Sequence, residues 1–131
     1  MPARLIWAGL GAASVAFHIW LIFSGLVPNL ISRPLHMALA LPWVFIFLAK
    51  TRASRMSGAI LTVVGIAGCL YIVHNEVALS DQYGSLEGAG QLWLAIGLIA
   101  IVLEMARRAI GWPLPVIASL ALAYGLFGNL L

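Results

Sequence analysis

The chain has 131 residues, of which 63% are hydrophobic and only 8% are charged. Soluble domains carry about 25% charged residues, so seven Lys or Arg and four Asp or Glu side chains are too few to cover a water-exposed surface. The composition therefore excludes a soluble enzyme, a nucleic-acid-binding module and a disordered tail, and we expect no nucleic-acid partner. The single Cys69 allows neither an intrachain disulfide nor a zinc site built from cysteines. What remains is an all-α integral membrane protein, with residues 1–131 forming a single membrane domain.

Charged residues divide the sequence into five apolar stretches, each close to the roughly 20 residues that a helix needs to cross a bilayer. Backbone polar groups in lipid must be paired within the chain, and the strict alternation of barrel strands is absent, so these stretches are expected to be helices. Pro42 lies within the second stretch and predicts a kink or a local break there. We expect about five transmembrane helices, at residues 4–26, 33–50, 56–74, 88–108 and 112–130.

The distribution of basic residues predicts the orientation of these helices. With the N-terminus in the cytoplasm, the outer side holds only Arg33, and the inner side holds the other six basic residues, namely Arg4, Lys50, Arg52, Arg55, Arg107 and Arg108. This arrangement follows the positive-inside rule. Five crossings then place the C-terminus in the periplasm of a bacterial cell, and the protein is expected in the inner membrane. Three acidic residues fall in the outer loop between the third and fourth helices: Glu76, Asp81 and Glu87.

Small residues recur on one face of several of these helices, where they let helix backbones approach closely in lipid. The expected faces include Ala8, Ala12 and Ala16 in the first helix, Gly58, Gly65 and Gly68 in the third, Gly90 and Gly97 in the fourth, and Ala121 and Gly125 in the fifth. These faces either pack the helices against one another or dock a larger subunit. Five short helices cannot cover all of them, so we expect at least one external contact.

Three histidines lie toward the expected outer leaflet, and ionisable residues in a membrane span point to function. His18 lies about 10 Å deep at 1.5 Å per residue, whereas His36 and His74 stand at the expected helix ends. One interpretation is a haem or metal site, or a proton-sensitive patch. The unequal depths favour the other interpretation, in which the histidines are hydrogen-bonded interfacial or packing residues of unknown role.

A second polar group lies at the inner end of the fourth helix. Glu104 precedes Arg107 and Arg108 by three and four positions, so its carboxylate can reach either guanidinium on a helix. The cluster is either an anchor that contacts lipid phosphates or a fixed contact with another subunit.

No catalytic or transport motif accompanies these clusters. The sequence has no phosphate-binding loop, no His-Glu-x-x-His and no Ser-His-Asp constellation, so we expect neither an enzyme nor a bound cofactor or metal. Ion-coupled carriers place polar residues or broken helices near the midplane, often in paired repeats, and Pro42 has no counterpart. The chain is therefore expected to be an accessory subunit.

Two runs carry a resemblance to a known family. The first is Leu-Glu-x-x-Arg-Arg-x-x-Gly-Trp at residues 103–112, and the second is Tyr-x-x-Phe-Gly at residues 124–128. Together with Phe17-His18 and Arg33-x-x-His36, they resemble the small membrane part of tripartite ATP-independent periplasmic (TRAP) transporters, most closely the TAXI-type group with fused membrane parts.

The resemblance implies a fold and a set of partners. In that family a periplasmic receptor captures a small organic acid, and a large subunit carries it inward by an elevator motion driven by a sodium or proton gradient. The small subunit has four helices that support the large one, and a fifth helix resembles the connector of fused members. Because the chain ends at Leu131, the large subunit is expected to be a separate chain.

The resemblance also suggests roles for particular residues. Glu104, Arg107 and Arg108 would hold the inner end of the fourth helix against the large subunit. The surface facing the receptor would consist of Arg33, Glu76, Asp81 and Glu87. Two alternatives stay open: a haem-binding membrane anchor of a respiratory complex, and a small autonomous transporter that works as a homo-oligomer.

Overall fold

The computed structural model describes residues 2–128, and all regular secondary structure in that range is helical. Its elements are α1 (Pro2–Ser24), α2 (Asn29–Pro42), the π-helix η1 (Trp43–Phe47), α3 (Arg52–His74), α4 (Glu76–Asp81), α5 (Ala89–Ile110) and α6 (Pro113–Phe127). By length and composition, four stretches are able to cross a membrane: Arg4–Ser24, Asn29–Phe47, Arg52–His74 and Ala89–Ile110. The all-helical class and the multi-pass membrane character expected from the sequence are therefore confirmed.

The expected fifth span corresponds to α6. Its 15 residues extend only about 22 Å at 1.5 Å per residue, which is less than the roughly 30 Å of a hydrocarbon core. The remainder of the predicted segment, residues 129 and 130, lies outside the described residues. The short helix α4, which lies in the expected outer loop, was not predicted from the sequence.

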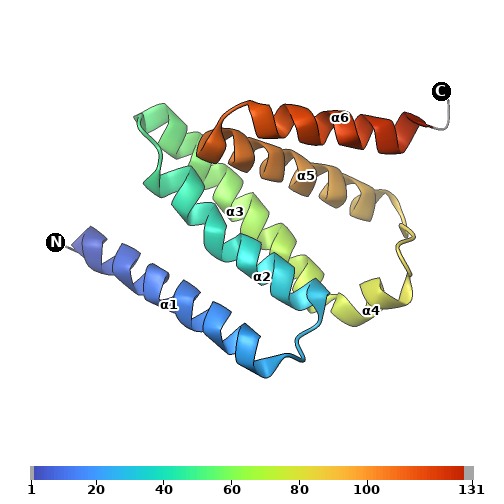
Figure 1. Ribbon diagram of the computed structural model, residues 1–131, viewed down its shortest axis with the longest axis horizontal. Helices are drawn as coiled ribbons and strands as arrows, with labels where there is room; N and C mark the ends of the chain where they lie inside the picture. Colours follow the sequence, from blue (N-terminus) through green and yellow to red (C-terminus); the bar gives the residue numbers. More distant parts are fainter. Residues whose placement is uncertain (1, 129–131) are drawn as a thin grey trace.

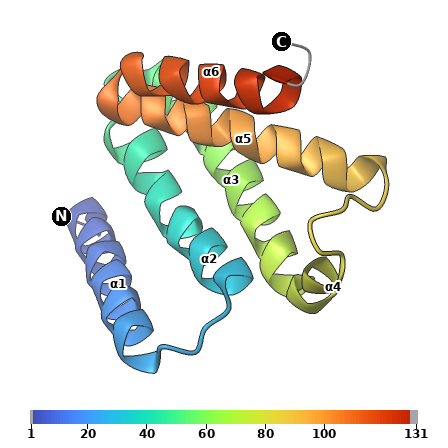
Figure 2. The same ribbon diagram turned by 45° about the vertical axis from the view of Figure 1, so that its right-hand side comes forward.

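The helices form an open, layered arrangement (Figure 1). α2 and η1 run antiparallel to α3 and pack along it, and α5 contacts both α3 and η1. α6 folds back along α5, while α1 lies beside α2 on the opposite side of the molecule, as both views show (Figures 1 and 2). α1 and α6 therefore form the two flanks of a central unit built from α2, η1, α3 and α5.

The second span begins earlier than its charge pattern predicts. α2 starts at Asn29, directly after Pro28, whose carbonyl accepts hydrogen bonds from the N–H groups of Ile31 and Ser32, both at 2.9 Å. Arg33 and Pro34, expected to mark the boundary, lie inside the helix. Arg33 can lie inside the helix because its long side chain can place its charge at the membrane interface. Pro34 lacks an N–H and therefore cannot donate the helical hydrogen bond at its position, but the helix continues past it.

Pro42 marks a break in the second span, as the sequence predicts. The α-helix ends there and continues as the π-helix η1, in which the N–H of Leu48 donates to the carbonyl of Trp43, five residues back, at 3.0 Å. Proline lacks the N–H that would continue the α-helical pattern, and single-turn π-helices often occur at such interruptions. The wider turn places Phe45 in the centre of the molecule, where it is completely buried.

The interior is small and forms around one face of α3. The core residues Leu41, Phe45 and Ile101 pack against that face, which carries the buried residues Gly58, Thr62, Gly65, Gly68 and Cys69. A Cβ added at Gly65 would lie 2.7 Å from Cδ1 of Leu41, so the Leu41 side chain would have to move to admit it. The small-residue face expected for the third span is thus an internal packing face.

The small-residue faces of the other helices point outward. Ala8, Ala12 and Ala16 of α1 are exposed. Within residues 2–128, a Cβ added at Gly90, Gly97 or Gly125 would meet no atom within 4 Å. These faces of α1, α5 and α6 do not contribute to packing inside the described part of the chain.

Candidate functional site

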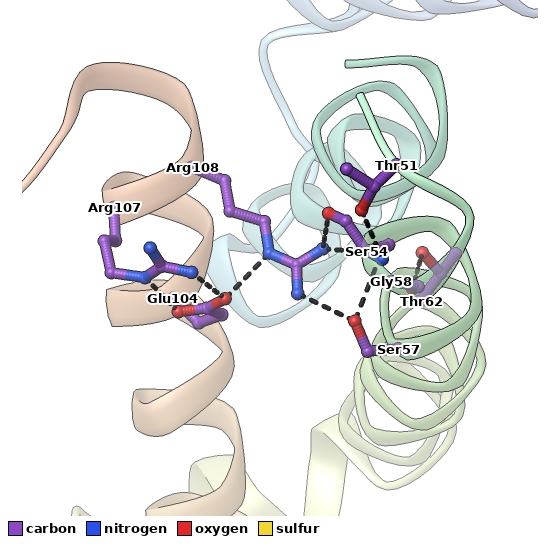
Figure 3. A network of polar contacts seen from close by, with 8 residues as sticks. All are labelled: Thr51, Ser54, Ser57, Gly58, Thr62, Glu104, Arg107 and Arg108. Atoms are coloured by element: carbon purple, nitrogen blue, oxygen red, sulfur yellow. Dashed lines mark hydrogen bonds and ion pairs between the residues drawn. The ribbon is translucent and has the colours of Figure 1, made fainter. Parts of the chain in front are cut away.

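A polar network joins α5 to α3 at the end of the molecule where α5 finishes (Figure 3). Its centre is the carboxylate of Glu104, which accepts hydrogen bonds from Nε of Arg107 at 2.6 Å, from Nη2 of Arg107 at 2.7 Å and from Nε of Arg108 at 2.7 Å. The predicted spacing therefore places all three side chains in contact. Charge-assisted bonds of this kind are stronger than bonds between neutral groups.

Arg108 extends the network from α5 to α3. Its Nη1 donates to the carbonyl of Ser54 at 3.0 Å, and its Nη2 donates to Oγ of Ser57 at 3.1 Å. The guanidinium also lies over the ring of Phe45, 5.0 Å from its centroid. Because the Arg108 side chain is only 15% exposed, it acts as an internal tie between α5, α3 and η1.

The first turns of α3 carry the groups that bond Arg108. Oγ1 of Thr51 accepts a hydrogen bond from the N–H of Ser54 at 3.1 Å, which caps the helix. Oγ1 of Thr62 donates to the carbonyl of Gly58 at 2.8 Å, so Thr62, the buried polar side chain of the core, is satisfied. The partners on α3 were not predicted from the sequence, although Thr51, directly before the helix, is a usual signal of a helix start.

Arg107 is placed differently from Arg108. Both of its hydrogen bonds stay within α5, and its guanidinium lies 5.4 Å from the ring centroid of Trp112. The side chain is 36% exposed. Both arginines were expected to contact another subunit. Arg108 instead bonds residues of its own chain, whereas Arg107 is partly exposed.

His18 and His36 form a second polar contact, between α1 and α2. Nε2 of His18 is hydrogen-bonded to Nδ1 of His36, and the ring centroids are 4.6 Å apart. Nδ1 of His18 donates to the carbonyl of Ser14 at 2.5 Å. Since a carbonyl can only accept, Nε2 of a neutral His18 must accept a hydrogen bond from the Nδ1–H of His36.

The expected difference in depth between these two histidines is wrong. Because α2 begins at Asn29, His36 lies about two turns inside the helix, a depth similar to that of His18 before the end of α1 at Ser24. His74 ends α3, is exposed, and makes no hydrogen bond to either ring within residues 2–128.

The geometry of the pair does not favour a metal between the two rings. An ion bound tetrahedrally by two imidazole nitrogens separates them by about 3.3 Å, whereas these nitrogens are hydrogen-bonded directly to each other. In the part of the chain that the structure describes, no three His, Cys, Asp or Glu side chains are grouped so as to hold a metal ion.

The acidic residues of the expected outer loop lie around α4. Glu76 and Asp81 are its first and last residues, and α4 contacts both α2 and α3. Glu87 precedes α5, and its N–H donates to Oε1 of Gln91 at 2.8 Å. Arg33 is exposed in the first turns of α2, and no ion pair joins it to these acids within residues 2–128.

An open groove separates α3 from the first turns of α5. Its volume is about 630 Å³, and its lining is mainly apolar, with Val63, Ala67 and Leu94 on its walls and Tyr71, Glu87 and Gln91 as the polar contributors. The two helices diverge at this end, as Figure 2 shows. The groove therefore lies at the end of α5 opposite Arg108.

Comparisons with protein-family models, with curated proteins and with solved structures find no match to this chain. Its function is therefore argued from its own residues.

Proposed function

We propose that this protein is an accessory membrane subunit of a TRAP-type secondary transporter for small organic acids. The observation that carries the accessory role is the composition of the interior. Within residues 2–128 the buried side chains are Leu41, Phe45, Cys69, Ile101 and Pro115, with Thr62 as the buried polar residue and glycines beside them. A solute pathway requires polar groups that replace water around an organic acid, and this interior offers none of the necessary charges.

The outward-facing small residues support a partner subunit. Lipid tails are as apolar as leucine, so a helix that contacts only lipid gains nothing from alanine or glycine on its surface. A neighbouring helix does gain, because small residues let two backbones approach closely. The faces of α1 and α5 that carry Ala12, Ala16 and Gly97 are suited to such a neighbour.

The TRAP assignment rests on the resemblance of residues 103–112, which supply Glu104, Arg107 and Arg108. In this proposal Arg107 contacts the large subunit, while the periplasmic receptor meets Arg33, Glu76, Asp81 and Glu87. The proposal keeps the N-terminus in the cytoplasm. The predicted segment 112–130, which is longer than α6, makes the fifth crossing of a bacterial inner membrane toward a periplasmic C-terminus. The coupling ion and the substrate bind to the large subunit.

Reconstitution tests this function directly. The tagged full chain is purified in mild detergent with the large polytopic subunit that accompanies it, and each is placed in liposomes alone and together. We expect uptake of a labelled organic acid under an ion gradient only when the large subunit, its receptor and this chain are all present. Uptake by this chain alone would show an autonomous transporter, and absence of a large polytopic partner would refute the assignment.

The partner face is tested with a matched pair of variants. Ala12→Leu adds bulk on the small-residue face of α1, whereas Ala13→Leu adds the same bulk at another exposed position about 100° around the same helix. We expect Ala12→Leu to lower recovery of the large subunit about tenfold, as for a lost contact of about 1.4 kcal/mol, and Ala13→Leu to leave it unchanged. Equal recovery with both variants would place the large subunit elsewhere.

The haem alternative has a simple optical test. A haem protein absorbs strongly near the Soret region, so a spectrum of the purified chain distinguishes a respiratory anchor from a transporter subunit. We expect no such band, in line with the direct contact between His18 and His36.

A further inference from the structure

A pocket of about 260 Å³ opens beside the polar network, between the end of η1, the start of α3 and the last turn of α5. One part of its lining is apolar and includes Val44 and Leu48. The other part is polar and cationic, formed by Lys50, Thr51, Arg107 and Arg108. The pocket therefore combines positive charge and an apolar wall within one small volume.

The cations around this pocket are only partly neutralised. Glu104 is shared by Arg107 and Arg108, and within residues 2–128 Lys50 has no carboxylate partner. Three positive side chains and one carboxylate leave an excess of two positive charges. Nη1 of Arg107 also makes no hydrogen bond to another described residue. The hydroxyl of Thr51 accepts from Ser54, and its own hydrogen is available to donate.

The pocket lies where three stretches able to cross a membrane have their ends. The stretch Asn29–Phe47 ends beside it, Arg52–His74 begins beside it, and Ala89–Ile110 ends beside it. The ends of membrane-spanning helices lie at the level of the lipid headgroups. An anion bound here at Lys50 and Arg107 would have the apolar side chains Val44 and Leu48 next to it.

We propose that this pocket binds the phosphate headgroup of an anionic phospholipid. Lys50, the outward Nη1 of Arg107 and the Thr51 hydroxyl donate to the phosphate oxygens. Val44 and Leu48 contact the adjoining acyl chain. Arg108 is already engaged by Ser54 and Ser57, and it contributes its charge and holds the wall of the pocket in place. Basic pockets between transmembrane helices are known sites for anionic headgroups. This inference does not depend on the proposed transport function, and it gives Arg107 a lipid ligand in place of the contact with the large subunit.

Binding is measured with the full chain in mild detergent by native mass spectrometry. Phosphatidylglycerol and phosphatidylcholine with identical acyl chains are titrated separately. We expect phosphatidylglycerol to bind at least about tenfold more tightly, because each basic residue near the surface contributes about 1 kcal/mol toward an anionic lipid. Equal affinity for the two lipids would overturn the proposal.

Two double variants with the same loss of charge locate the site. Lys50→Gln with Arg107→Gln removes two donors of the pocket. Arg52→Gln with Arg55→Gln removes two charges from exposed positions at the start of α3, close by but outside its lining. We expect about 30-fold weaker phosphatidylglycerol binding for the first pair and less than about threefold for the second.

Equal losses in the two pairs would show a general attraction to the basic end of the molecule and would overturn the site. Because Arg107 also bonds Glu104, Lys50→Gln alone is measured as well, and about fivefold weaker binding is expected. Finally, inorganic phosphate in millimolar excess is expected to leave the lipid bound. Displacement of the lipid by inorganic phosphate would show a site for the free ion instead.

Discussion

At the scale of single residues, the contact between His18 and His36 is the polar link that joins α1 to the rest of the chain. At the other end of α1, Trp7 packs against Trp43 and Phe47, with ring centroids 5.0 and 5.1 Å apart. The hydrogen bond between the two imidazoles needs one nitrogen without a proton. Removing either ring therefore breaks the link.

We therefore predict that replacing His36 loosens α1. The distance between spin labels at Ile22 of α1 and Val63 of α3 is measured with Cys69 replaced by Ala. Its distribution should be broader in His36→Ala than in the parent, because the hydrogen bond between α1 and α2 is lost. His74→Ala is the control and should give the distribution of the parent. An equally narrow distribution in His36→Ala would contradict this role.

Side-chain contacts within one helix could be predicted from the sequence, whereas contacts between helices could not. The contacts among Glu104, Arg107 and Arg108 follow from helical spacing, because residues three and four apart share a face. The contact between His18 and His36 depends on how α1 and α2 are aligned along their axes. The charge of Arg33 suggested a helix boundary there, although α2 begins earlier, at Asn29. The bonds from Arg108 to Ser54 and Ser57 connect residues more than fifty positions apart, which no local pattern specifies.

At the scale of elements, α3 is the helix around which the others pack, and Gly58 shows why its small residues are needed. A Cβ added there would lie 2.0 Å from the carbonyl oxygen of Phe45 and 3.1 Å from Nη1 of Arg108. The first neighbour is backbone of η1, which cannot rotate away as a side chain can. The break at Pro42 was predictable from sequence, but its π-helical form and its fit against Gly58 were not.

Gly58→Ala should therefore be strongly destabilising. We expect a loss of about 3 kcal/mol or more in the free energy of unfolding, because overpacking against backbone forces η1 and α3 apart. Gly97→Ala is the matched control, since its Cβ meets nothing within 4 Å in the described chain and should change stability by less than about 1 kcal/mol. Unfolding in detergent, followed by loss of helical signal, measures both. A Gly58→Ala protein as stable as Gly97→Ala would contradict the packing described here.

At the scale of the whole molecule, the ends of the helices separate two kinds of charge. The start of α1, the junction of η1 with α3 and the end of α5 lie toward the left in Figure 1, and α4 lies at the other end. All basic residues except Arg33 belong to the first group, and Glu76, Asp81 and Glu87 belong to the second. This separation was visible in the sequence, and it supports a cytoplasmic first group by the positive-inside rule.

The orientation can be measured with single cysteines placed on either side of α3. With Cys69 replaced by Ala, Ser85→Cys should react with a membrane-impermeant maleimide on intact cells. Ala53→Cys should react only after the membrane is opened, because the positive-inside rule places it in the cytoplasm. The opposite pattern would invert the topology, and equal labelling of both positions would show that α3 does not cross the bilayer.

The groove between α3 and α5 has a mechanical consequence for the bilayer. The helices are tied together by Arg108 and the core at one end, and they spread apart around the groove at the other. In a bilayer, this shape would displace more area from one leaflet than from the other. A neighbour that fills the wider side would remove that difference, so the accessory role proposed above predicts a contact at the groove.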